Sequence, residues 1–193
     1  MLLHKKIIKV LIVLVLSIGL GSGLATLANN NGKYETFESE EFGFSISYPE
    51  DWNKEYRDKK GELYPYLRLS STDPRAATTV TIIELASPTS LKELKRFREL
   101  HAQILDESWN KIKIEEFAGL QAVTAHYARV GKMMVKGEDG SEKWEKNEWK
   151  VKWIGLISEG YLYRITTSAP QEGYEEVNEK YLSKILDSFE FTK

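Results

Sequence analysis

The fold is decided by the stretch Phe42-Gly43-Phe44-Ser45-Ile46-Ser47-Tyr48-Pro49-Glu50-Asp51-Trp52. Its apolar residues alternate with small ones as far as Tyr48, which is the two-residue period of a half-buried strand. Pro49 cannot donate a hydrogen bond to a neighbouring strand, so the strand is predicted to end there. Trp52 lies just beyond the turn and is expected to fold back over the apolar face of the strand.

Alternation and β-branched residues predict further strands along the chain. A strand at residues 34–38 would form an opening hairpin with residues 42–48. The other predicted strands lie at residues 64–70, 78–85, 113–117, 120–135, 144–158 and 161–168, with a short final strand at 189–191. The charge-rich segment 53–61 is predicted to be a surface loop.

Two helices are predicted. Ser90-Leu91-Lys92-Glu93 fits a capping box and begins a helix of about 16–18 residues. Its apolar stripe, expected to face a sheet, consists of Leu91, Leu94, Phe97, Leu100, Ile104 and Leu105. The second helix is predicted to begin near Ser168-Ala169-Pro170-Gln171. Its apolar residues are Tyr174, Val177, Tyr181, Leu182, Ile185 and Phe189.

The last hairpin predicts the layer order. If Glu159-Gly160 is a two-residue loop, Ser158 lies opposite Tyr161, and the pairing continues along both strands. One face then carries Ile154, Leu156, Tyr161, Tyr163 and Ile165, and the other carries Trp149, Val151, Trp153, Ile157 and Leu162. Because both faces are apolar, both should be covered. The predicted fold class is α+β: an α/β/α sandwich with a central antiparallel sheet covered by helices on both faces.

Residues 1–28 are predicted to be a signal peptide or an N-terminal membrane anchor. Lys5, Lys6 and Lys9 form a positive region around the start of an apolar run, and Thr26-Leu27-Ala28 offers small residues for cleavage. Residues 29–33 form a short tether, and residues 34–193 form one domain. Whether or not cleavage occurs, the domain is expected to be extracytoplasmic, either secreted or tethered to the outer side of the cytoplasmic membrane.

Composition excludes several classes of protein. The chain has no cysteine, which rules out disulfides, thiolate metal sites and cysteine nucleophiles. Without the three lysines of the export segment, 24 basic residues stand against 29 acidic ones, a net charge of −5. The two signs are interspersed and form no basic stripe, so nucleic-acid binding is not expected.

The stretch Gly43–Trp52 also resembles the signature of the PsbP-like family. A Gly119-Leu120-Gln121-Ala122 segment that opens a long strand, and a terminal helix closing in Leu186-Asp187-Ser188-Phe189, extend the resemblance over residues 34–191. It implies an α/β/α sandwich around an antiparallel sheet. Members of that family mostly act as binding or assembly factors, so the resemblance implies a non-enzymatic domain that binds or helps assemble a cell-envelope partner.

No catalytic or metal site is predicted, and no cofactor. His4 belongs to the export segment, His101 lies beside the apolar stripe of the first helix, and His126 is in the middle of a strand. Neither of the last two has a second ligand at metal-binding spacing, and both are interpreted as ordinary histidines at the edge of the core. The loop 137–142 lacks the alternating ligands of a calcium loop.

The aromatic hairpin Trp144–Tyr163 supports an alternative function, a small-ligand or carbohydrate-binding module. Trp149, Trp153 and Tyr163 are expected to fill the core, which leaves Trp144 as the exposed exception. A second alternative is a hydrolase whose acids converge only in three dimensions. The ligand-binding residues, the oligomeric state and the identity of any partner stay open.

Overall fold

The computed structural model describes residues 32–58, 64–104, 109–136 and 142–192, although the side chains at 103–104, 109–111, 132–136 and 142–145 fall outside that description. The predicted export segment, most of the tether and the loop at 137–141 lie outside the described residues, so these predictions stay untested. Among the described residues, no helix combines the length and apolarity that a membrane span requires.

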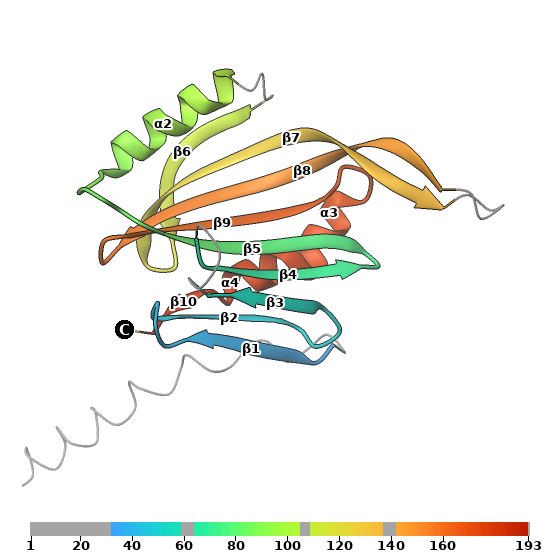
Figure 1. Cartoon of the computed structure of the whole chain (residues 1–193), viewed down its shortest axis with the longest axis horizontal. Coiled ribbons are helices and arrows are strands. Elements are labelled where there is room, and N and C mark those ends of the chain that lie inside the picture. Colours follow the sequence, from blue (N-terminus) through green and yellow to red (C-terminus); the bar gives the residue numbers. More distant parts are fainter. Residues whose placement is uncertain (1–31, 59–63, 105–108, 137–141, 193) are drawn as a thin grey trace, which may run out of the picture. The chain divides into compact units, whose positions relative to one another are not determined.

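The strands form two antiparallel sheets (Figure 1). The small sheet has the order β1-β2-β10, and the large sheet has the order β3-β4-β5-β9-β8-β7-β6. The strands are β1 (Tyr34–Ser39), β2 (Phe44–Pro49), β3 (Asn53–Arg57), β4 (Tyr66–Thr72), β5 (Arg75–Glu84), β6 (Trp109–Phe117), β7 (Leu120–Lys136), β8 (Glu142–Ser158), β9 (Tyr161–Pro170) and β10 (Glu190–Phe191).

The helices are α2 (Leu91–Ile104) and a C-terminal helical run made of α3 (Tyr174–Val177), the π-helical η1 (Asn178–Leu182) and α4 (Ser183–Asp187). The capping box at the start of α2 is confirmed. The Glu93 N–H donates to the Ser90 hydroxyl at 3.2 Å, and the Ser90 N–H donates to the Glu93 carboxylate at 2.8 Å. Both bonds satisfy N–H groups near the first turn that have no partner within the helix.

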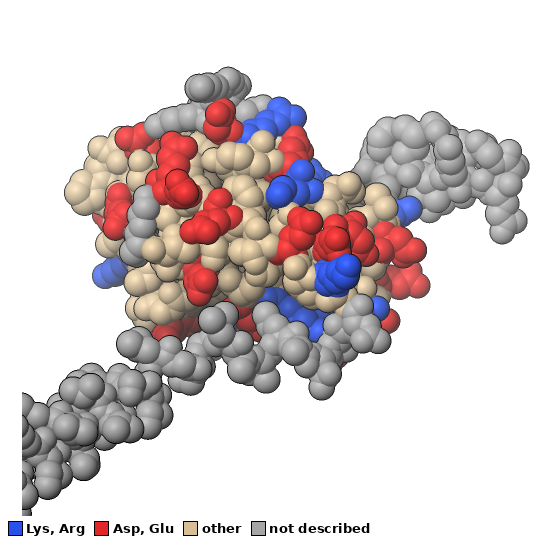
Figure 2. Space-filling view, turned by 90° about the horizontal axis from the view of Figure 1, so that it is seen from below, with Lys and Arg blue, Asp and Glu red and all other residues tan. Residues whose placement is uncertain are grey.

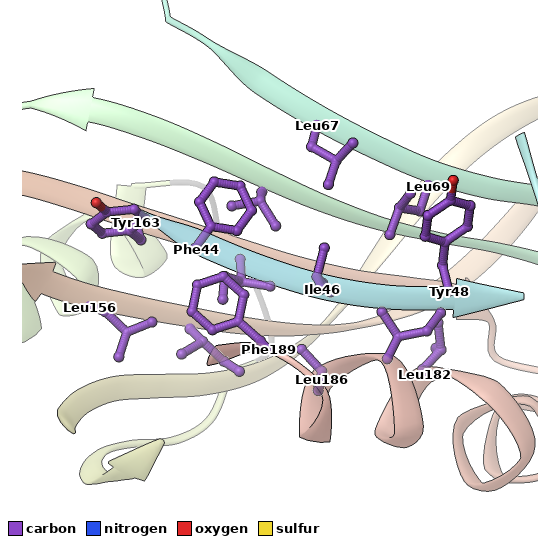
Figure 3. Close-up of a cluster of buried hydrophobic side chains, with 14 of the residues drawn as sticks. Phe44, Ile46, Tyr48, Leu67, Leu69, Leu156, Tyr163, Leu182, Leu186 and Phe189 are labelled. Atoms are coloured by element: carbon purple, nitrogen blue, oxygen red, sulfur yellow. The ribbon is translucent and has the colours of Figure 1, made fainter. Parts of the chain in front are cut away.

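The opening stretch is the centre of the main core. Phe44, Ile46 and Tyr48 on β2 are at most 1% exposed, and they pack between the large sheet and the C-terminal helical run (Figure 3). The Phe44 ring stacks on Phe189 with centroids 5.4 Å apart. Trp52 is buried in the same core, with its ring 5.9 Å from that of Tyr181. The alternation along β2 was therefore a correct guide to its buried side.

The register of the last hairpin is confirmed. Ser158 pairs with Tyr161, Leu156 with Tyr163, and Ile154 with Ile165. Glu159 and Gly160 both have positive φ, at 48° and 82°, as a tight two-residue turn requires. The two faces of the hairpin enter two different cores: Ile154 and Leu156 pack in the main core, while Trp153 packs with Leu94 of α2.

Several predicted boundaries differ from the structure, and two of the differences change how a segment is interpreted. Residues 53–57 form β3, paired with β4 at the edge of the large sheet, rather than a loop. All five β3 residues are exposed, and a charged, exposed edge strand discourages pairing with other chains. The second helix begins at Tyr174 and not near Ser168, because β9 continues to Pro170 and Gly173 turns the chain with φ 75°.

The predicted stripe on α2 is also partly wrong. Phe97 and Leu100 are 63% and 50% exposed, while Leu94, Arg98 and Ala102 face the sheet and are buried. Positions 94, 98 and 102 are four residues apart and form one face of a helix. Positions 97 and 100 belong to the neighbouring face, so Arg98 lies against the sheet and Phe97 and Leu100 do not.

The domain consists mostly of strands with a few helices. Helix α2 lies against β6, β7 and β8, and the opposite face of the large sheet packs on the small sheet together with the C-terminal helical run (Figure 1). This arrangement does not establish the predicted helical cover over each face, because the α2 side is hollowed over β4, β5 and β9.

The buried Tyr163 hydroxyl predicts a loss of stability at alkaline pH. It donates to the Phe42 carbonyl oxygen at 2.8 Å, and burial, followed by the nearby Glu159, raises the pKa of Tyr163 to about 12 from 10.0. The folded state holds this proton more tightly than the unfolded state. Stability is therefore unaffected below pH 10 and falls as the pH rises to about 12.

We expect this one group to cost on the order of 2 to 3 kcal/mol of unfolding free energy over that interval. Urea unfolding of the wild type and of Tyr163→Phe across the interval measures it, since the other tyrosines contribute equally to both. The variant should show the weaker pH dependence. Parallel pH profiles for the two proteins would contradict this assignment.

Candidate functional site

A groove of about 380 Å³ lies on the α2 side of the large sheet. Its lining comes from six elements: Arg68 on β4; Ala77, Thr79 and Thr81 on β5; Arg98 and His101 on α2; Tyr127 and Arg129 on β7; Val151 and Trp153 on β8; and Arg164, Thr166 and Ser168 on β9. Four arginines and one histidine thus border one hollow.

The strand register places small side chains on the floor of the groove. Thr79 lies opposite Thr166, and Ala77 lies opposite Ser168, across the β5–β9 pair. Opposite residues in an antiparallel pair share a face, so these side chains form one patch. Since α2 packs on β6, β7 and β8, this patch is left without a helix above it. The hollow results from the short side chains on β5 and β9 and from the position of α2 over β6, β7 and β8.

Arg98 is held rigidly at one side of the groove. It is 8% exposed, and its guanidinium lies 5.1 Å from the Trp153 ring and 5.3 Å from the Tyr127 ring. Its Nη1 is 3.0 Å from His101 Nδ1. Because a guanidinium has only donors, the histidine nitrogen is the acceptor. The stack on two rings fixes a positive charge where the sheet meets α2.

Arg68 and Arg164 are exposed at the other side of the floor. Arg164 Nη2 donates to Thr81 Oγ1 at 3.4 Å. Glu55 is the cross-strand partner of Arg68, but its carboxylate accepts from Tyr66 at 3.0 Å and from Arg57 at 2.8 Å. These two hydrogen bonds, Tyr66 first, lower the pKa of Glu55, with a smaller contribution from Arg68. The carboxylate across the strand pair from Arg68 therefore accepts hydrogen bonds from other groups.

The basic residues that line the groove are arginines and not lysines. The chain has 27 basic residues, of which only seven are arginines, yet four arginines and no lysine line the groove. Guanidinium groups present planar, paired donors that match carboxylate and phosphate oxygens, whereas an ammonium group acts as a point charge. The lining is therefore suited to recognising oxyanions.

The family model for PsbP matches residues 32–191. The chain belongs to the PsbP family. The solution structure of cyanobacterial PsbP (CyanoP) from Synechocystis sp. PCC 6803 is similar with a TM-score of 0.55 at 13% identity, covering 86% of this chain and 97% of that chain. At this identity the likeness shows a shared fold and nothing about the groove.

Two other solved structures are similar to a lesser degree. The Ran-binding protein Mog1p of Saccharomyces cerevisiae has 12% identity over 84% of this chain and 97% of its own, with a TM-score of 0.48. LpqN of Mycobacterium tuberculosis, involved in cell envelope biogenesis, has 8% identity over 86% and 88%, also with a TM-score of 0.48. Both scores are too low to bear on what this chain binds. Among curated proteins, none matches by sequence comparison.

The two histidines of the PsbP domain lie in different places. His101 lines the groove, while His126 borders a second cavity of about 440 Å³ together with Lys150, Lys152 and Tyr174. Partial desolvation, followed by the charge of Lys152, lowers the pKa of His126. Within the described part of the PsbP domain, no three His, Asp or Glu side chains gather as metal ligands.

The aromatic residues divide as follows. Trp153 and Tyr163 are 5% and 2% exposed and lie on opposite faces of the sheet, and Trp149 is half-buried. The side chain of Trp144 lies outside the described residues. Arg98 covers one face of Trp153, so this ring is not a bare platform for a sugar.

The motifs and periodicity of this PsbP-family sequence did not predict the groove. Arg68, Arg129 and Arg164 carried no motif, and Arg98 lay within a helix whose apolar stripe was placed one face away. A signal was present in two of the predicted strands, where the alternate positions Thr79, Thr81, Thr166 and Ser168 carry hydroxyl groups. Small polar residues on one face of an interior strand indicate a surface that nothing apolar covers.

Proposed function

We propose that this chain is a non-enzymatic, extracytoplasmic PsbP-family domain that binds or helps assemble a cell-envelope partner through the arginine-lined groove. One observation carries the proposal: four guanidinium groups from four different elements border a floor of hydroxyl groups. Membership of the PsbP family and the predicted export segment support the binding role and the location.

The lining of the groove favours binding over proton transfer. Its charged side chains are arginines, which stay protonated, and no carboxylate is among its lining residues. His101 is the one titratable base there, and its Nδ1 accepts from Arg98. A general base requires a free lone pair directed at the substrate. The arrangement therefore holds charge in place rather than moving protons.

The test is recovery of the partner from intact envelopes of the native host. The tagged full-length chain would be purified under mild conditions as wild type, as Arg68→Gln/Arg164→Gln and as Arg96→Gln. Arg96 is exposed on α2 outside the groove, so its variant controls for the loss of a surface arginine. We expect wild type and Arg96→Gln to retain the same partner and the double variant to lose most of it.

Recovery of free chain alone from the wild type would contradict the partner-binding role. Equal recovery of the partner by wild type and the double variant would contradict the use of the groove while leaving the binding role in place.

A small-ligand or carbohydrate-binding module is the second candidate, because the groove of about 380 Å³ has the size of a small-ligand site and Trp153 of the aromatic hairpin borders it. Tryptophan fluorescence of the wild type, measured against neutral sugars and small organic molecules, distinguishes it from partner binding. A saturable change that survives in the arginine double variant would favour this candidate. The hydrolase alternative gains no support from the two cavities, since the first has no acidic residue in its lining and the second has Glu175 alone.

A further inference from the structure

We infer that the groove binds an extended peptide segment that carries several carboxylates. The inference deepens the proposed function and rests on it, since it names the chemistry of the partner's contacting segment.

The arginines are spread along the groove rather than gathered at one point. Arg68 on β4 pairs with Thr79 on β5, which pairs with Thr166 on β9. Arg68 and Arg164 are therefore separated by two inter-strand spacings and by two residues along the strand. Strands are about 4.8 Å apart and successive residues rise about 3.3 Å, so the two Cα atoms are roughly 12 Å apart.

The span to the last arginine is longer. Arg129 pairs with Trp149, which pairs with Pro170, six residues along β9 from Arg164. The same spacings put Arg129 and Arg164 roughly 20 Å apart between Cα atoms. One phosphate or a short dicarboxylate does not reach both ends. An extended peptide of about six residues reaches from Arg129 to Arg164, and its acidic side chains can meet arginines at both ends of the groove.

The floor accommodates such a segment. Ala77, Thr79, Thr166 and Ser168 stand no higher than a few atoms above the sheet, which leaves room for a second layer of chain. Their hydroxyl groups are donors and acceptors that a peptide backbone can use. Arg98 is already fixed on Trp153 and Tyr127, so it loses little conformational entropy when it meets a carboxylate.

The charge of the domain makes this groove distinct from the rest of its surface. The exported part has a net charge of −5, and acidic side chains are prominent on the side seen from below (Figure 2). An acidic segment is repelled by such a surface and attracted to the four arginines. The complex should therefore form at one place and weaken as salt rises.

The experiment is fluorescence-anisotropy titration of the full domain with a labelled hexaglutamate peptide blocked at both ends. We expect saturable binding that weakens when salt is raised from about 50 mM to about 300 mM. Arg68→Gln and Arg164→Gln should each weaken it by about tenfold, because each removes a charge-assisted pair. Arg96→Gln should leave it within about twofold. Since Arg68 and Arg164 are exposed, these variants are expected to fold as the wild type does.

Competition identifies the class of anion. Tripolyphosphate, citrate and a blocked hexaglutamine peptide are added as unlabelled competitors. Displacement by unlabelled hexaglutamate, with little effect of the others at the same concentration, supports the inference. Stronger displacement by tripolyphosphate or citrate overturns it in favour of a compact anion. Absence of hexaglutamate binding, or equal binding by the arginine variants, also overturns it, and if the envelope partner is still retained, the proposed function survives.

Discussion

Trp52→Ala is expected to lower the free energy of unfolding by about 3 to 5 kcal/mol, the usual range for truncating a large buried aromatic side chain. Trp52 is 5% exposed and packs in the main core beside Tyr181. Its removal leaves a cavity between the turn after β2 and the C-terminal helical run, and both are anchored elsewhere, so the cavity cannot collapse fully. Urea unfolding followed by circular dichroism measures the loss.

Phe97→Ala is the matched control for this change. Phe97 is also a large aromatic residue, but it is 63% exposed, so its truncation should cost less than about 1 kcal/mol. Both variants should bind hexaglutamate as the wild type does wherever they are folded. If Trp52→Ala kept full stability and lost binding, Trp52 would be part of a binding site rather than of the architecture.

Gly155→Ala is expected to destabilise the domain by about 1 to 3 kcal/mol and to disturb the groove. A Cβ atom at Gly155 would lie 2.4 Å from Trp153 Cη2 and 3.0 Å from Leu94 Cδ2. The Trp153 ring packs against Leu94 of α2 on the same side of the sheet, and Arg98 lies over it. Either the ring or the helix must shift, and Arg98 then loses the stack that orients its charge.

Gly131→Ala is the control, since a Cβ there meets only ordinary contacts at 3.7 Å or more from Trp149. Replacing a glycine within a strand in this way should be neutral or stabilising by up to about 1 kcal/mol. Thermal unfolding and hexaglutamate titration of both variants check the pair. Equal stability of the two variants would show that α2 packs less tightly on Gly155 than these distances indicate.

The sequence correctly predicted the features that depend on residues close together in the chain: a turn, the buried face of a strand and the start of a helix. The Glu159-Gly160 turn fixed the register of the hairpin, because two consecutive residues with positive φ allow one tight connection. The alternation along β2 predicted its buried face, because the side-chain period of a strand is fixed. The capping box predicted the start of α2 within one residue, because its hydrogen bonds join neighbours in sequence.

The features that the sequence did not predict, namely β3, the burial of Arg98 and the groove, depend on contacts between distant segments. The charged residues of β3 are not typical of a strand, and they form one because β4 offers a free edge. Arg98 is buried because Trp153 and Tyr127, from two other elements, form a surface on which its guanidinium stacks. The groove combines residues from six elements, and its lining is spread from residue 68 to residue 168. The periodicity of apolar residues predicts which face of a helix or strand is buried. It does not predict where neighbouring elements leave a groove.

The pairing of β2 with β10 has a consequence for the order in which the chain acquires its structure. Ser45 and Glu190 are joined by a hydrogen bond although 145 positions separate them, and the Ser47 N–H donates to Ser188 Oγ at 2.8 Å. A chain that emerges N-terminus first has β2 and its first partner β1 available early, whereas its second partner β10 comes last. Contacts of such high sequence separation form slowly, because a long loop must close before they contribute. We therefore expect the burial of Phe44 and Ile46 to be completed only when Phe189 and the last residues of the chain are in place.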